Sequence, residues 1–211
     1  MDYEDEAEAM TLLCHLCTLH ETDKGGGPHF RYAGGDSDTV HNYSPVYYRL
    51  FKDMRDEVLS VLEIGVHGGS SLRVWRDFFP NAHIVGLDTN AECLKHSEKR
   101  ITVLMADQNN PRSIYDALAK LSPDTPPFSL IVDDGSHERE HQIVSLKALL
   151  PFLDPHGYYV VEDLGTGPRV NLLGLFEAVP PAYIAESVII EGGHGPKVQP
   201  YEYLFVVRHR P

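Results

Sequence analysis

The sequence predicts an α/β fold with a mainly parallel sheet, helices on both faces and an antiparallel edge at the C-terminus. From residue 58 onward, short apolar runs alternate with segments of helical spacing. Strands separated by helices of this length imply right-handed βαβ units. The last two apolar runs are joined instead by the Gly-rich residues 192–196. A hairpin there adds an antiparallel edge, which mixed sheets often carry.

The segment before residue 58 is predicted to be helical. Residues 6–20 carry apolar side chains at helical spacing. Residues 25–38 are rich in glycine and polar side chains, which predicts a mobile loop. A second helix begins at Ser44-Pro45, because serine caps a helix and proline suits its first turn.

The strands and helices that follow are predicted from their apolar pattern. Strands are expected over residues 58–65, 83–88, 101–107, 128–134, 157–163, 183–191 and 201–209. Helices are expected over residues 70–79, 91–100, 113–121 and 141–152.

Length and composition limit the class of protein. A chain of 211 residues fits one domain, which we divide into an N-terminal helical segment with a lid loop, 1–57, and a core, 58–211. The net charge of −13 argues against nucleic acid and anionic membrane as partners. No run reaches the ~18 apolar residues of a membrane span, and the acidic N-terminus shows no signal peptide. We therefore expect a cytoplasmic protein.

The three cysteines are too few for a disulfide scaffold. Cys14 and Cys17 look like half of a zinc site, but no second cysteine pair follows. We expect both to be buried or half-buried thiols on an apolar helix face.

Acidic residues end five successive predicted strands. Ligands of parallel sheets bind at the carboxyl ends of the strands, so a row of acids at that edge indicates a binding site more than a series of helix caps. The acidic strand ends are Glu63, Asp88, Asp107, Asp133/Asp134 and Glu162/Asp163.

A glycine-rich turn follows the first of these strands and opens a helix. Its residues Gly65, Gly69 and Ser70 do not form a dinucleotide fingerprint, and Glu63 beside them would repel a pyrophosphate. An acid there suits a ligand with a positive centre and hydroxyl groups. Asp88 lies 23 residues after Gly65, near the ~20 expected for a carboxylate that binds a ribose.

Further short motifs run from about residue 22 to residue 165. They include Thr22-Asp23-Lys24-Gly25, His41-x-Tyr43 with Tyr47, Leu62-Glu63-Ile64-Gly65-Val66, Leu72-Arg73-Val74-Trp75-Arg76-Asp77, Asp107-Gln108, Asp133-Asp134-Gly135-Ser136-His137 and Val161-Glu162-Asp163-Leu164. This set resembles class I S-adenosylmethionine-dependent methyltransferases. It is more similar still to the metal-dependent sugar O-methyltransferases of macrolide and related antibiotic biosynthesis.

The resemblance implies a Rossmann-like class I methyltransferase sheet, S-adenosylmethionine as methyl donor, Mg²⁺ as metal and a sugar hydroxyl as acceptor. It implies that Asp134, Glu162 and Asp163 bind the metal and that His137 is the general base. It suggests that Lys24, His41 and Tyr43 close over the donor. The expected cofactor-binding residues are Lys24, His41, Tyr43, Glu63, Gly65, Gly69, Ser70, Asp88, Asp107, Gln108 and Asp133, with Asp107-Gln108 placed to reach an adenine amino group.

Chemistry supports the metal and the base independently. Adjacent parallel strands lie about 4.8 Å apart, so acids that end neighbouring strands can converge on one ion. Three carboxylates favour a hard cation such as Mg²⁺, and His137 follows Asp134 on the same loop. The competing interpretations are a helix cap for Asp133 or Asp134, a solvent-exposed loop histidine for His137, and a solvated pair for Glu162 and Asp163.

The sequence alone does not identify the methyl acceptor. The insertion 26–39 separates two motifs, and residues 165–169 lack the aromatic side chains that the resemblance leads us to expect. A sugar or glycoside is the first expectation, a catechol or phenolic acceptor the second, and a non-catalytic S-adenosylmethionine-binding protein the third. The sequence is silent on oligomeric state, a homodimer or higher homo-oligomer being the commonest arrangement.

Overall fold

The computed structural model describes residues 11–25, 41–164, 172–191 and 201–210. The expected lid loop, the Gly-rich link between the last two strands and residues 165–169 lie outside these ranges. Within them, no helix has the length and apolar character needed to cross a bilayer.

A seven-stranded sheet in the order β3-β2-β1-β4-β5-β7-β6 forms the centre of the molecule. The first five strands pair in parallel, and β7 runs antiparallel to both β5 and β6. This confirms the predicted mixed sheet. The strands are β1 Ser60–Ile64, β2 His83–Asp88, β3 Ile101–Met105, β4 Phe128–Asp133, β5 Leu153–Val161, β6 Tyr183–Glu191 and β7 Tyr201–His209.

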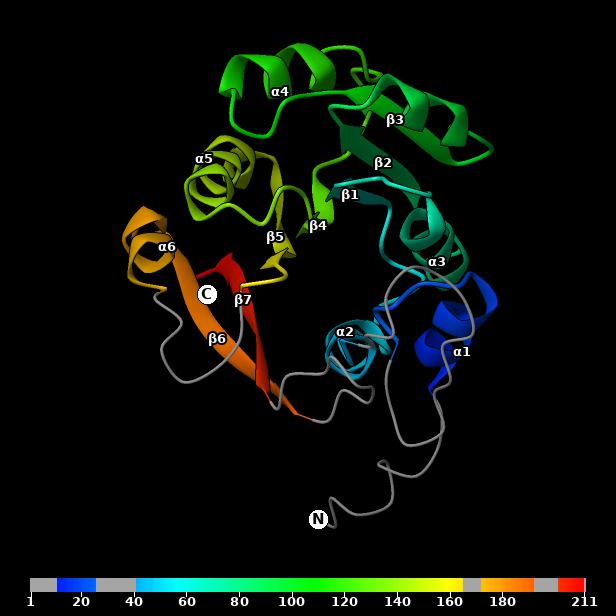
Figure 1. The fold of residues 1–211 in the computed structure, drawn as a ribbon, viewed down its shortest axis with the longest axis horizontal. Helices are drawn as coiled ribbons and strands as arrows, with labels where there is room; N and C mark the ends of the chain where they lie inside the picture. The colour runs from blue at the N-terminus through cyan, green and yellow to red at the C-terminus, as the bar shows by residue number, and fades with distance from the viewer. Residues whose placement is uncertain (1–10, 26–40, 165–171, 192–200, 211) are drawn as a thin grey trace.

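Helices cover both faces of the sheet (Figure 1), with α1, α2 and α3 gathered on one side and α4, α5 and α6 on the other. The helices are α1 Leu12–Leu19, α2 Ser44–Phe51, α3 Ser70–Phe78, α4 Pro111–Leu118, α5 Arg139–Leu149 and α6 Leu173–Ala178, with 3₁₀ segments η1 Ala91–His96 and η2 Leu150–Phe152. Several predicted bounds differ from the observed ones. The strand expected from residue 157 begins at Leu153, and the helix expected over 91–100 is the shorter η1. Helix α6 was not expected.

Two apolar cores result, because successive strand residues point to opposite faces. In β1, Val61 packs with α1–α3, whereas Leu62 and Ile64 pack with α4–α6. Trp75 is buried in the first core. Cys14 and Cys17 are also buried free thiols, which confirms that expectation.

The strand register brings the carboxyl ends of the central strands to one edge. Ile64 of β1 pairs with Leu87 of β2 and with Asp133 of β4, and Asp133 pairs with Val161 of β5. Residues that directly follow these positions must therefore meet at the same edge of the sheet.

Gly86 provides a test of the packing between the sheet and α3. A Cβ atom there would lie 2.7 Å from Val66 Cγ2 and 2.8 Å from Leu72 Cδ1. We predict that Gly86→Ala lowers the free energy of unfolding by about 1–3 kcal/mol, the usual cost of overpacking a core. Gly68→Ala is the control, since a Cβ there meets nothing within 4 Å. Urea unfolding of both variants measures the difference, and equal stabilities would contradict this packing.

Candidate active site

A cavity of about 1080 Å³ opens at the carboxyl edge of the sheet. Its walls come from the glycine turn after β1, from the ends of β2, β4 and β5, and from residues 21–24, 41 and 43. Ten of the predicted site residues line it: Lys24, His41, Tyr43, Gly65, Ser70, Asp88, Asp134, His137, Glu162 and Asp163.

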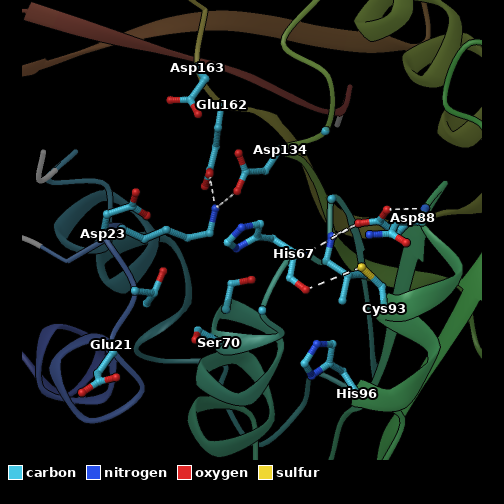
Figure 2. A pocket seen from close by; sticks show the side chains of 18 of the residues that line it. Glu21, Asp23, His67, Ser70, Asp88, Cys93, His96, Asp134, Glu162 and Asp163 are labelled. Atoms are coloured by element: carbon cyan, nitrogen blue, oxygen red, sulfur yellow. Dashed lines mark hydrogen bonds and ion pairs between the residues drawn. The ribbon is translucent and has the colours of Figure 1, made fainter. Parts of the chain in front are cut away.

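The cavity has two chemically different ends (Figure 2). Asp134, Glu162 and Asp163 gather at one end, and Asp88, Cys93 and His96 lie at the other. His67 and Ser70 from the turn and the start of α3 lie between them.

The buried ammonium group of Lys24 lies among the carboxylates. Its Nζ donates to Asp134 Oδ2 at 2.5 Å and to Glu162 Oε2, the two bonds drawn as dashed lines in Figure 2. Glu63 Oε1 lies 3.4 Å from the same nitrogen. Although burial lowers the pKa of Lys24, the negative charges of Asp134, Glu162 and Glu63 raise it well above its usual value. Lys24 is therefore a cation held inside the protein.

Tyrosine hydroxyls hold the remaining oxygens. Tyr47 donates to Glu162 Oε1 at 2.6 Å, and Tyr43 donates to Asp163 Oδ1 at 2.8 Å. His41 stacks on Tyr43 with ring centroids 5.1 Å apart, and its Nδ1 lies 2.9 Å from Glu202 Oε1. Despite the opposing effect of burial, the hydrogen bond with Glu202 raises the pKa of His41 to about 9. The side chain of His41 is thus a second cation beside the acidic cluster.

His137 faces two carboxylates. Its Nε2 lies 3.3 Å from both Asp134 Oδ1 and Asp163 Oδ2. The bond to Asp134 raises the pKa of His137, and about half of the side chain, 48%, is exposed. The possible ligand atoms of Asp134, His137 and Asp163 lie within 4.8 Å of one another. Carboxylate oxygens are the donors that Mg²⁺ prefers, so this set fits a divalent cation.

Asp88 and the glycine turn shape the other end. Asp88 Oδ2 accepts hydrogen bonds from the backbone amides of Val66 at 2.9 Å and His67 at 3.3 Å. Gly65 has a φ of +91°, and a Cβ there would lie 1.9 Å from the carbonyl oxygen of Asp134. Only glycine permits this approach, which brings the turn against the loop that carries Asp134 and His137.

Comparison with known proteins agrees with this geometry. Residues 62–164 match the sequence family described as a methyltransferase domain. The matched segment, just under half of the chain, is thus similar to a methyltransferase domain. Demethylmacrocin O-methyltransferase of Streptomyces fradiae is 40% identical over 144 residues, 64% of this chain and 35% of that protein. Mycinamicin VI 2''-O-methyltransferase of Micromonospora griseorubida is 39% identical over 135 residues, 60% of this chain and 32% of that protein.

A solved structure of the MycE methyltransferase from the mycinamycin biosynthetic pathway, in complex with Mg, SAH and Mycinamycin VI, superposes with a TM-score of 0.67. It is 28% identical and covers 96% of this chain and 55% of that one. The chain thus spans about half the length of this structure, and its alignments span about a third of the two sequence relatives.

Five of the predicted cofactor-binding residues do not line the cavity: Glu63, Gly69, Asp107, Gln108 and Asp133. Gly69 is the left-handed residue before α3, and the exposed Asp107 accepts a hydrogen bond from the backbone amide of Asn109. Glu63 is buried and accepts a hydrogen bond from Trp75 Nε1 at 3.0 Å. The buried side chain of Glu63 therefore lies behind the cavity wall and does not form part of its surface.

Asp133 and Gln108 form a buried network under the cavity. Gln108 Nε2 lies 2.5 Å from Asp133 Oδ1, and its Oε1 accepts a hydrogen bond from the Ser136 amide at 2.9 Å. Ser145 and Tyr159 donate to Asp133 Oδ2. Burial raises the pKa of Asp133 to about 6 despite these donors. Neither Asp133 nor Asp134 caps α5, because its N-cap is Glu138.

Sequence reasoning missed Glu202, His67 and Cys93. His67 and Cys93 line the cavity near Asp88, with Cys93 Sγ 3.5 Å from the carbonyl oxygen of His67. Glu202 lies in β7, where nothing in the local pattern distinguishes it from an ordinary strand carboxylate. Glu202 binds His41, which lies 161 residues away in the sequence, so only the folded structure reveals this contact.

Ser145 tests the buried network. Ser145→Ala removes one of the two donors to Oδ2 of the buried Asp133 carboxylate, and the loss of a hydrogen bond to a buried carboxylate costs about 1–3 kcal/mol. We predict a loss of that size in the free energy of unfolding, measured by denaturant titration. Ser122→Ala on the surface is the control. A Ser145→Ala protein as stable as the control would contradict the network.

Proposed function

We propose that this protein is a Mg²⁺-dependent O-methyltransferase that moves the methyl group of S-adenosylmethionine to a hydroxyl of a sugar or glycosylated natural product. The observation that carries the proposal is the convergence of Asp134, Asp163 and His137 beside a cavity lined by the glycine turn. The relatives' names and the MycE complex with Mg, SAH and Mycinamycin VI support it.

The methyl donor would occupy the cavity from Asp88 to the acidic end. Asp88 supplies a carboxylate suited to ribose hydroxyls. The glycine turn offers an approach close to the backbone, and the surrounding acids favour a ligand that carries a positive sulfonium. Because Asp133 and Gln108 lie beneath the cavity, their contribution is to hold the loop of residues 134–137 in place.

The metal would be held by the carboxylates of Asp134, Glu162 and Asp163, which all line the cavity. When bound, the cation supplies positive charge that lowers the pKa of a nearby hydroxyl. Tyr43 and Tyr47 fix Asp163 and Glu162 in orientation through their hydroxyls. Such outer hydrogen bonds hold ligand carboxylates in the geometry that an ion requires.

His137 would accept the proton of the acceptor hydroxyl. Its half-exposed imidazole is oriented by Asp134 and Asp163 at 3.3 Å, and both carboxylates stabilise the imidazolium that results. The deprotonated oxygen then attacks the methyl carbon in line with the departing sulfur. The protein contributes mainly positioning and charge stabilisation.

Chelation tests the reaction. We predict methyl transfer from S-adenosylmethionine to a glycoside in a panel of sugars, glycosides and catechols, lost with EDTA and restored by Mg²⁺. Turnover only with catechols would point to the phenolic acceptor. Tight donor binding without turnover on any acceptor would contradict an enzyme and favour a binding protein.

His137→Ala tests the base. We predict that kcat falls about 10²–10⁴-fold, the usual contribution of a general base, while the affinity for S-adenosylhomocysteine stays near that of the wild type. His156→Ala, at an exposed position away from the cavity, is the matched control. If donor affinity collapsed in His137→Ala, the residue would belong to the cofactor site instead.

A further inference from the structure

Lys24 and Glu63 form a buried pair that the proposed chemistry leaves unused. Glu63 is fully buried, and within the described chain its Oε1 accepts no hydrogen bond. The nearest cation is the Lys24 ammonium at 3.4 Å, which instead donates to Asp134 and Glu162. An orphaned carboxylate oxygen inside a protein is costly, so its persistence beside a cation needs an explanation.

The same ammonium contacts two of the three predicted metal ligands. Both oxygens of Glu162 already have partners, Lys24 at Oε2 and Tyr47 at Oε1. Asp134 has Lys24 at Oδ2 and His137 near Oδ1. A divalent cation that bound Asp134 and Glu162 would meet a fixed positive charge on these carboxylates, and like charges at such separations repel strongly in a buried site.

We infer that Lys24 is a transferable counter-ion, bound to Asp134 and Glu162 in the metal-free protein and moving onto Glu63 when a divalent cation takes those two carboxylates. The inference rests on the proposed function, because it assumes that the acidic end holds the metal. In the metal-free arrangement Glu63 Oε1 has only a long ion pair with Lys24 and no hydrogen bond, whereas in the loaded arrangement it accepts a hydrogen bond from the ammonium.

The backbone around Lys24 limits how far its side chain travels. The Lys24 carbonyl accepts a hydrogen bond from the Ser44 amide at 2.9 Å, and the Asp23 carbonyl accepts one from the His41 amide at 2.9 Å. With the main chain held, the ammonium already lies within 3.4 Å of an oxygen from each of the three carboxylates. The transfer therefore requires no unfolding of the N-terminal segment.

A double-mutant cycle tests this transfer through metal affinity alone. Mn²⁺ is titrated into the wild type, Lys24→Met, Glu63→Gln and the double variant, and electron paramagnetic resonance measures free Mn²⁺. We expect Lys24→Met to bind Mn²⁺ about tenfold more tightly and Glu63→Gln about tenfold more weakly, within the range that neighbouring residues exert on metal sites. In the Lys24→Met background, Glu63→Gln should change the affinity less than about threefold, because the two residues act as one unit.

Lys147→Met, exposed on α5, is the matched control and should bind Mn²⁺ like the wild type. Weaker binding by Lys24→Met would overturn the inference, since Lys24 would then only orient the ligands. An equal effect of Glu63→Gln in both backgrounds would also overturn it. If Lys24→Met does not fold, Glu63→Gln decides: unchanged affinity overturns the transfer, and weaker affinity supports it. A wild type that binds no Mn²⁺ would overturn the metal site of the proposed function as well.

Discussion

The structure depends on the compensation of negative charge where the central strands end. Glu63, Asp134 and Glu162 come from β1 and from the chain just after β4 and β5, and parallel pairing forces them to one edge. Three carboxylates cannot share a buried site without a cation. Lys24, from the segment between α1 and α2, supplies one.

This ion cluster explains why the N-terminal segment packs where it does. α1 and α2 contribute to the same apolar core as α3, and Lys24, Tyr43 and Tyr47 all bring polar groups from this region to the carboxylates. The segment therefore does more than cover the sheet, because it completes the acidic end of the cavity. The same charges favour cationic ligands, and a divalent ion and a sulfonium are both of this kind.

Much of the fold could be predicted from local pattern. The bounds expected for β2, β6 and β7 coincide with the observed ones, because each strand contains a cluster of β-branched or aromatic residues. α6 was missed because its six residues are too few to establish a helical period. The pattern of residues 91–100 predicted a polar helix. However, Glu98 forms an isolated β-bridge with Ile101, so the chain turns into β3 after η1.

The site could be predicted only in part. Acids at strand ends identified the edge of the sheet where the cavity opens, but Asp133, expected to bind the cofactor, does not line that cavity. Successive side chains of an extended chain point to opposite sides, so Asp133 lies in the buried network while Asp134 faces the cavity. The pairs between Lys24 and Glu63 and between His41 and Glu202 join distant segments, and only the folded chain reveals them.

A crystal of the full chain soaked with MnCl₂ tests the central claim most directly, through an anomalous difference map at the manganese edge. The account predicts a single strong peak at the acidic end of the cavity, within about 2.2 Å of a carboxylate oxygen of Asp134 and of one of Asp163, the usual length of such bonds. A soaked crystal that shows no manganese peak there, or shows the peak elsewhere in the cavity, would contradict the account.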